Sequence, residues 1–279
     1  MTIKFLKHSI SSLKLAKKSS SAIFKDSTFS SLISRYFDSD VKNNAFIDSN
    51  INSSPKSAYY DTLYELIKAN ESSPIQLKAI ALKFQKILSL EVEQFIIQRL
   101  LNNQYANHLS NNGGRYDIFP KSLYCPNCNK EYSIIKQKDY IDNLKLNKIP
   151  TICTLWHHLR LPRNFQSIGE LVGNPFDSTP NNKATLYYPL NLLIVRNGNH
   201  SANVALYENN TSIKKTDISD VSHWFNDIYF DPKTNTLNHI TCGTPVDTQQ
   251  LFHENIGYIY EISRLLYQNN IFFTINDLL

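Results

Sequence analysis

The chain has 279 residues, of which 42% are hydrophobic and 12% aromatic, enough for the packed core of one large domain or two modest ones. The formal net charge is +5, but residues 1–25 hold six lysines and no acidic residue, so the remaining residues carry a net charge of −1. Because the rest of the chain is nearly neutral, the overall positive charge is weak evidence for nucleic-acid binding outside the basic segment. The basic segment itself suits phosphates or an acidic membrane surface.

No apolar run approaches the roughly 18–20 residues that a transmembrane helix needs, and lysines interrupt any signal-peptide core near the N-terminus. We therefore expect a cytoplasmic protein without a membrane span. The frequent Asn, Ile, Lys and Ser residues are typical of AT-rich bacterial coding. In a reducing compartment, the four cysteines indicate thiols or metal ligands rather than disulfides.

The first part of the chain, residues 1–55, is rich in Ser, Asn and Lys, and we expect it to be loosely ordered. A helical region, 56–115, follows, because apolar residues recur there at helical spacing in two or three helices. Ser73 and Pro74 are a helix cap and a first helical residue. The Asn-Asn-Gly-Gly run at 111–114 predicts a break.

From residue 116 onward, short apolar runs alternate with turns. These runs predict strands at 132–135, 149–155, 185–188 and 192–195. A short helix is expected over 166–172, a long helix over 248–268 and a last strand over 272–275. The sequence therefore predicts an α+β fold: a helical N-terminal region, a mixed α/β core within 116–279, and a C-terminal helix that packs on it.

Two short cysteine motifs have the spacing of half zinc sites. Cys125 and Cys128 are separated by Pro and Asn, and His239 and Cys242 by Ile and Thr. The residue after each motif, Asn or Gly, tolerates the positive φ that lets backbone N–H groups point at sulfur. Facing each other, the two motifs would form a tetrahedral Cys3His site for a structural Zn²⁺ that clamps the two ends of the α/β core together.

Other interpretations of the cysteines remain open at this point. Cys153 with His157 or His158 would also complete a zinc site with the first motif. Alternatively, Cys153 and Cys242 are ordinary buried thiols, and the first motif is a solvent-facing turn.

The stretch 156–163, Trp-His-His-Leu-Arg-Leu-Pro-Arg, is dense in recognition chemistry. His157 and His158 suit proton transfer near neutral pH, and Arg160 and Arg163 suit bidentate phosphate binding. The stretch follows a predicted strand, so it would line a cleft; the alternative is a structural segment in which histidine packs against tryptophan.

A sharp strand-to-helix turn is predicted at residues 197–201, Asn-Gly-Asn-His-Ser. It follows the buried strand at 192–195 and precedes a helix that begins near Ala202 with Ser201 as its cap. Free N–H groups at such a turn favour phosphate, so Asn197, Gly198, Asn199 and Ser201 form the expected cradle.

Two neighbours complete this candidate site. Arg196 would add a phosphate contact beside the turn, and His200 is the candidate catalytic residue, which would contact or protonate a phosphoryl oxygen.

The strand, the turn and the helix together resemble the phosphate-binding segment of the ParB/sulfiredoxin-like fold, over about 150–210. Proteins with this turn also resemble an uncharacterised bacterial family, which we expect near mobile elements and phage-defence genes. Ser201 stands where the better-known families have a phosphate-contacting arginine. The resemblance implies nucleotide binding, phosphotransfer or nuclease activity.

Two functions follow as hypotheses. The first is a protein that binds a nucleotide or phosphate group at the turn, with Mg²⁺ accompanying the nucleotide, as a candidate phosphotransferase or nuclease. The second is a non-enzymatic, zinc-stabilised module that binds nucleic acid, or binds a protein through its helical regions. The structural interpretation of the turn, with its histidine bonded to a neighbouring carbonyl, stands beside both.

Overall fold

The computed structural model describes residues 57–70, 72–102, 117–246 and 250–279. All of them belong to one compact unit, Pro55–Leu279. The predicted loose segment 1–55 and the predicted break at 111–114 lie outside the described residues. The proposed boundary between a helical region and an α/β core near residue 115 stays a prediction.

Two helices open the described part of the chain. Helix α3 spans Ser57–Ala69, and α4 spans Pro74–Leu101 in 28 uninterrupted residues. The side chain of Ser73 accepts a hydrogen bond from the N–H of Gln76, while the side chain of Gln76 accepts one from the backbone N–H of Ser73. This capping box satisfies two donors at the start of α4, and proline at the first helical position adds a fixed φ.

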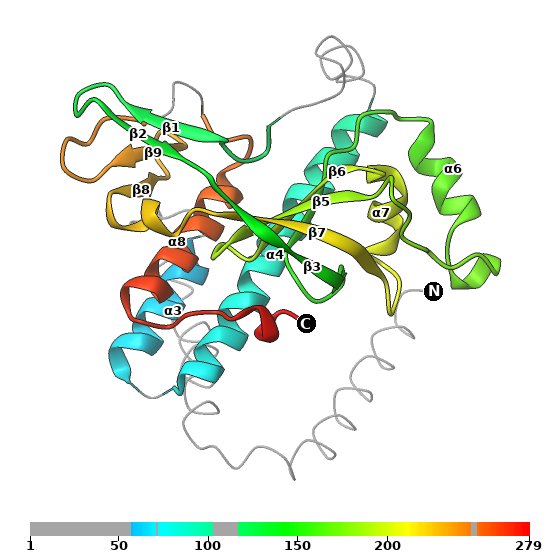
Figure 1. Ribbon diagram of the computed structural model, residues 1–279, viewed down its shortest axis with the longest axis horizontal. Helices are drawn as coiled ribbons and strands as arrows, with labels where there is room; N and C mark the ends of the chain where they lie inside the picture. The colour runs from blue at the N-terminus through cyan, green and yellow to red at the C-terminus, as the bar shows by residue number, and fades with distance from the viewer. Residues whose placement is uncertain (1–56, 71, 103–116, 247–249) are drawn as a thin grey trace, which may run out of the picture. The chain divides into compact units, whose positions relative to one another are not determined.

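A mixed five-stranded sheet forms the centre of the unit, in the order β3-β7-β5-β6-β4 (Figure 1). Its strands are β3 Ile135–Lys145, β4 Thr151–Cys153, β5 Lys183–Tyr188, β6 Leu192–Asn197 and β7 Ser212–Asp220. Strands β5 and β6 form an antiparallel hairpin, β4 runs parallel to β6, and β7 runs parallel to β5 and antiparallel to β3.

Two small hairpins extend the fold at the end where β1, β2, β8 and β9 are labelled in Figure 1. One pairs β1 Ser122–Cys125 with β2 Lys130–Ser133, and the other pairs β8 Ile228–Asp231 with β9 Thr236–His239.

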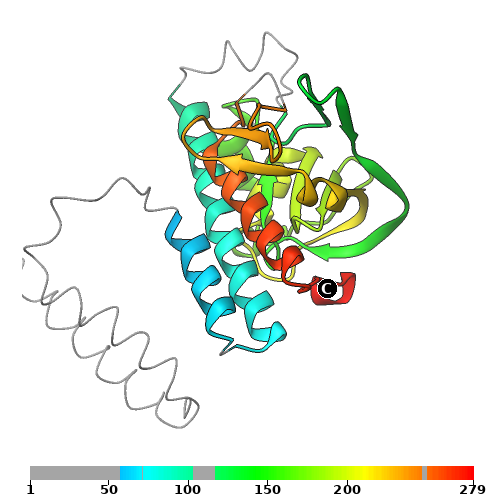
Figure 2. The ribbon, with the colours of Figure 1, turned by 90° about the vertical axis from the view of Figure 1, so that its left-hand side faces the viewer.

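The last long helix, α8, spans Glu254–Gln268 and lies beside α3 and α4 (Figure 2). The expected mixed α+β class and the C-terminal helix are thus confirmed. Helix α8 begins later than predicted because the side chain of His253 accepts from the N–H of Asn255 and caps it there. None of the described helices is long and apolar enough to cross a membrane.

Two of the predicted elements are wrong. The helix expected over 166–172 is instead the end of α6, Arg160–Ser167, followed by a 3₁₀ turn, Glu170–Val172. Gly169 separates them with φ of 136°, which interrupts the helix. The strand expected over 272–275 does not form, and a 3₁₀ turn, Ile275–Asp277, capped by Thr274, closes the chain.

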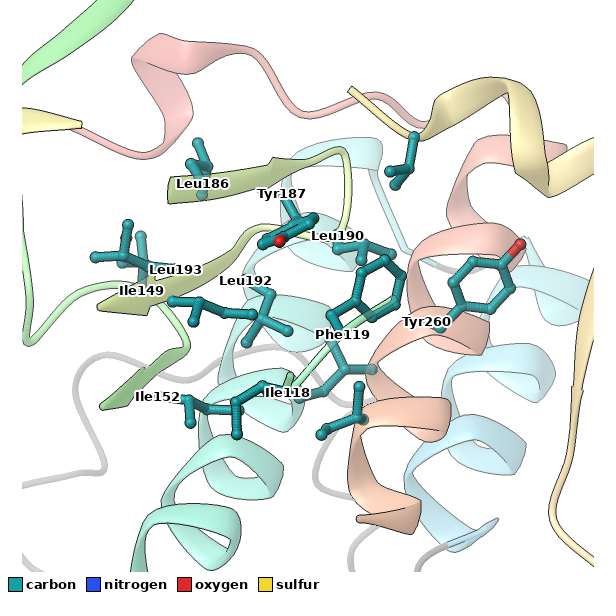
Figure 3. Packing of buried hydrophobic residues seen from close by; sticks show 14 of the residues in the cluster. Ile118, Phe119, Ile149, Ile152, Leu186, Tyr187, Leu190, Leu192, Leu193 and Tyr260 are labelled. Carbon is teal, nitrogen blue, oxygen red and sulfur yellow. The ribbon is translucent and has the colours of Figure 1, made fainter. Parts of the chain in front are cut away.

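The hydrophobic core joins the helices to the sheet through large aromatic side chains. The Phe119 ring is centred 5.1 Å from the Tyr187 ring of β5, 5.7 Å from the Trp224 ring and 6.5 Å from the Tyr260 ring of α8. Figure 3 shows Phe119 between the β5–β6 hairpin and α8. Because Phe119 lies just before β1, this packing fixes the position of the chain that enters the first small hairpin.

Candidate anion site and metal cluster

The turn between β6 and α7, Asn199–Ala205, is built on Gly198. Gly198 has φ of 68° and ψ of 25°, in the left-handed region. A Cβ at this position would lie 2.2 Å from Nδ2 of Asn182, so both the backbone conformation and the space require glycine. The Asn182 amide donates to the carbonyl of Gly198 at 3.3 Å and thereby holds the turn against the start of β5.

Ser201 is not the cap of this helix, contrary to the prediction. Gly198 occupies the cap position, so α7 begins at Asn199, and Ser201 donates its hydroxyl to the Gly198 carbonyl at 2.9 Å. The left-handed glycine turns the chain directly into the helix, which removes the need for a side-chain cap. Because α7 has only seven residues, its dipole is small, and any preference for anions must come from charged side chains.

Asn199 ties the turn to the neighbouring strand. Its amide donates to both the carbonyl and the hydroxyl oxygen of Thr154, at 2.8 Å each, and Thr154 directly follows β4. Asn199 is almost fully buried, so its side chain positions the turn.

His200 is buried at 5% exposure and neutral at pH 7. Burial, with the nearby positive charge of Arg160, lowers the pKa of His200 to about 4. Its Nε2 accepts a hydrogen bond from the backbone N–H of His157 at 3.2 Å, so the neutral ring carries its proton on Nδ1. This arrangement suits a hydrogen-bond donor much better than a proton acceptor.

A cavity of about 530 Å³ lies between this turn and α6. The described residues that line it include two arginines, Arg160 and Arg163, and no acidic side chain. The remaining lining is mainly amide and hydroxyl groups, from Asn164, Thr179, Asn181, Asn182, Asn197, Asn199 and Ser201. The guanidinium of Arg160 lies 4.6 Å from the ring centre of Trp156, a cation–π contact that fixes its position at the wall.

The structure divides the predicted anion-binding residues into three groups. All five residues of the turn, with Arg160 and Arg163, line the cavity. His157 and His158 do not line it; their rings stack on each other at 5.5 Å, and His157 contributes through its backbone N–H. Arg196 lines a second cavity on the face of the sheet, where it donates to the Tyr187 hydroxyl.

Sequence reasoning missed several residues of this cavity. Thr179, Asn181 and Asn182 come from the loop before β5, and Asn164 comes from α6. The Ser-Thr-Pro-Asn-Asn run at 178–182 is a turn signal, but nothing local in it indicates that it faces residue 200.

A buried carboxyl group supports the turn from below. Glu93 of α4 is fully buried; one of its oxygens accepts from the backbone N–H of Cys153, and the other from the Asn203 amide of α7 at 2.6 Å. Burial raises the pKa of Glu93 to about 8, although both hydrogen bonds act in the opposite direction. Glu93 is therefore largely protonated at pH 7. The missed signal was its helical spacing from the apolar residues Leu100 and Ile96, with which it shares the buried face of α4.

The two cysteine motifs meet in one cluster. Sγ of Cys125 lies 3.4 Å from Sγ of Cys242, and Nδ1 of His239 lies 3.6 Å from Sγ of Cys128 and 3.7 Å from Sγ of Cys242. All four potential ligand atoms lie within 4.8 Å of one another, so the cluster could hold a metal ion.

The local backbone is that of a ligand knuckle on both sides. Asn129 has φ of 47° and Gly243 has φ of 66°, as the motif predicts. Hydrogen bonds from the hydroxyl and backbone of Thr244 lower the pKa of the Cys242 thiol. The hydrogen bond with Cys242 raises the pKa of the Cys128 thiol, so the first proton to leave this pair comes from Cys242. Cys153 lies outside this cluster, buried in β4, where burial raises its pKa.

Comparison with curated proteins gives no match, and neither does comparison with solved structures. Residues 29–273, which include the cavity, the metal cluster and the buried glutamate, match one family over most of the chain. The chain therefore belongs to DUF6710, a family of unknown function.

Proposed function

We propose that the protein binds a phosphate-bearing ligand of the nucleotide class in the cavity beside residues 197–201. The observation that carries this proposal is the charge of the lining: two arginines and no acidic group among the described residues. A cavity of about 530 Å³ is in the range of small-molecule sites. Guanidinium and amide donors around it match the oxygens of a phosphate group.

Each part of the lining then has a role. Arg160 and Arg163 supply the charge, and the asparagine amides and hydroxyls supply neutral hydrogen bonds. His200, neutral and with its proton on Nδ1, is a candidate donor to a phosphoryl oxygen, the role that would serve phosphotransfer or nuclease chemistry. The described lining offers no carboxylate for Mg²⁺, so that ion would arrive bound to the nucleotide.

The proposed kinship with the ParB/sulfiredoxin-like fold is compatible with this arrangement. Strand β6, the turn at Gly198 and helix α7 follow one another as that segment requires. Ser201 occupies the place of the usual arginine, and we infer that Arg160 and Arg163 of α6 supply the missing positive charge.

We further propose that the Cys/His cluster holds a structural Zn²⁺. A tetrahedral zinc ion with Zn–S of about 2.3 Å places its sulfur ligands about 3.8 Å apart and a sulfur and a nitrogen about 3.6 Å apart. Three of the six separations, between 3.4 and 3.7 Å, are close to these values, and the other three lie within 4.8 Å. The ion would join the β1–β2 hairpin to the β8–β9 hairpin, and the thiols would be kept reduced in the cytoplasm.

Calorimetric binding of nucleotides, with and without Mg²⁺, tests the cavity. We expect micromolar binding that Arg160→Gln or Arg163→Gln reduces about tenfold or more, because each removes a charge-assisted hydrogen bond. Lys136→Gln on the exposed edge strand β3 removes the same charge outside the cavity and is the matched control. His200→Ala tests the donor, with the variant's unfolding curve as a check on its fold.

Two results would count against the cavity. If Lys136→Gln reduces the affinity for nucleotides as much as the arginine variants do, the loss reflects the overall charge of the protein and not the cavity. Failure of every nucleotide to bind would favour the second function, a zinc-stabilised interaction module without turnover.

A further inference from the structure

A second cavity, of about 520 Å³, lies on one face of the sheet next to the first. The register places its side chains: Thr185 of β5 pairs with Ile194 of β6 and with Asp217 of β7, so these three lie on the same face. Arg196 lies two residues after Ile194 and therefore points to that face as well. All four line the cavity.

The two cavities share a wall. Asn197, an exposed residue at the end of β6, lines both of them. Thr154 lines the second cavity and Asn199 the first, and the two are hydrogen bonded at 2.8 Å. Because Asn197 is exposed, a ligand that lies over it would contact residues of both cavities.

The chemistry of the second cavity differs from that of the first. It contains two carboxylates, Asp117 and Asp217, among basic side chains, whereas the first cavity has no acidic side chain among its described lining residues. Each carboxylate would repel a phosphate placed next to it. Lys121 is paired with Asp117 at 2.9 Å, whereas Asp217 makes no ion pair with any other described residue. An exposed carboxylate of this kind accepts hydrogen bonds from hydroxyl or amino groups.

The cavity also has an apolar floor. Ile194 and Phe119 line it next to the Tyr187 ring, and both are buried in the core, so the floor is rigid. A rigid apolar floor beside a carboxylate without an ion pair suits a flat ring that carries hydroxyl or amino groups. The basic side chains Lys183 and Arg196 also line the cavity and add positive charge that favours an anionic ligand.

We propose that the two cavities form one bipartite site for a nucleotide, with the phosphates at Arg160 and Arg163 and the nucleoside on the sheet face at Asp217. This inference rests on the proposed function and extends it, since it names the part of the ligand that would give specificity. The phosphates supply charge, and the sugar or base donates to Asp217 while its ring covers Ile194.

The experiment compares inorganic pyrophosphate with a panel of the four nucleoside diphosphates by calorimetry, on the full chain. At least one nucleoside diphosphate should bind about tenfold tighter than pyrophosphate, the effect of one good hydrogen bond to a charged group. Asp217→Asn should remove most of that difference and leave the affinity for pyrophosphate within about twofold. Asp142→Asn, on exposed strand β3 and lining neither cavity, is the matched control.

The outcomes separate the two proposals. If pyrophosphate binds through Arg163 but no nucleoside diphosphate binds more tightly, the bipartite site is wrong and the phosphate site stands. The bipartite site is equally overturned if Asp217→Asn weakens pyrophosphate and nucleotides alike. If neither probe binds, or if Arg163→Gln changes nothing, both proposals fail.

Discussion

Replacing Glu93 with glutamine is expected to change how the stability of the protein depends on pH. The Glu93 carboxyl is fully buried between α4, β4 and α7, with partners at the N–H of Cys153 and the amide of Asn203. Glutamine has nearly the same shape and mimics the protonated acid. The side-chain oxygen Oδ1 of Asn203 has no hydrogen-bond partner among the described residues. After a flip of the Asn203 side chain, this oxygen can accept a hydrogen bond from the amide of the new glutamine.

The sign follows from the direction in which folding moves the pKa. The pKa of Glu93 is about 8 in the folded protein against 4.5 for the ordinary side chain, so between these values the folded state holds a proton that the unfolded state has lost. Stability from this group is complete below pH 4.5 and is lost as the pH rises through 8. A tenfold change in a proton-binding constant corresponds to about 1.4 kcal/mol, so the whole pKa difference gives at most about 5 kcal/mol.

His200 acts in the opposite direction at lower pH. Its pKa falls from 6.5 to about 4 on folding, so stability from this group rises with pH between these values. Glu93 and His200 therefore oppose each other between pH 4.5 and 6.5. Above pH 6.5 the effect of Glu93 predominates, and the wild-type protein should lose about 2 kcal/mol relative to Glu93→Gln between pH 6.5 and pH 9.

Urea unfolding of both proteins at several pH values measures this difference directly. Contributions from all other groups, including the metal cluster, are common to both proteins and cancel. Glu65→Gln, on the exposed side of α3, is the control for removal of a carboxylate. Parallel stability curves for wild type and Glu93→Gln from pH 6.5 to 9 would refute the assignment of a buried, protonated Glu93.

Three further outcomes are expected. Purified protein should contain about one zinc ion per chain by elemental analysis. Cys128→Ser should lose both the zinc and thermal stability, whereas Cys153→Ser should keep them, since only Cys128 is in the cluster. Zinc retained by Cys128→Ser would exclude the proposed ligand set. Gly198→Ala should abolish nucleotide binding, because φ of 68° and the nearby amide leave no place for a methyl group, and unchanged affinity would show that the turn does not form the site. Gly257→Ala should lower the free energy of unfolding in urea by about 1–3 kcal/mol, because the new Cβ would lie 2.2 Å from the Phe230 ring and force α8 and β8 apart. An unchanged free energy of unfolding would mean that α8 and β8 pack less closely than described.

The parts of the fold that the sequence predicts are those whose pattern is local. Strands β5 and β6 are nearly continuous apolar runs, and α4 has a capping box before a long helical pattern. Strands β3 and β7 were not predicted, because β3 is mostly exposed and both carry several charged side chains. Pairing with each other and with β5 makes them strands, and that pairing is not visible in either segment alone.

The same distinction holds for the sites. The knuckle spacing around Cys125 and His239 predicts half a zinc site at each motif, with Cys153 as an alternative partner, and the structure brings the two motifs together across more than a hundred residues of sequence. The cavity around Gly198 was predicted only in part, because its remaining amides come from α6 and from the loop before β5. A long-range contact of this kind leaves no periodic or spacing signal in either segment.

Two titratable groups, His200 in the turn and Glu93 behind α7, also determine how the cavity should respond to pH. At pH 7 His200 is neutral because its pKa is about 4, and Glu93 is largely neutral because its pKa is about 8, so Arg160 and Arg163 provide the charge at the cavity. Cys153, which faces Glu93, stays a thiol because burial raises its pKa. Ionisation of Glu93 would place a negative charge next to Asn203 of α7, the helix whose first residues line the anion site.

Binding of pyrophosphate should therefore weaken in the wild-type protein as the pH rises from 7 to 9, and should stay nearly constant in Glu93→Gln. Pyrophosphate gains negative charge as the pH rises over this range, which by itself would strengthen binding to arginines, so a decrease cannot come from the ligand. If both proteins respond alike, the carboxyl group supports the fold without influencing the field at the cavity. A decrease confined to the wild type would link the buried glutamate of α4 to ligand binding at residues 197–201, through the single hydrogen bond from Asn203.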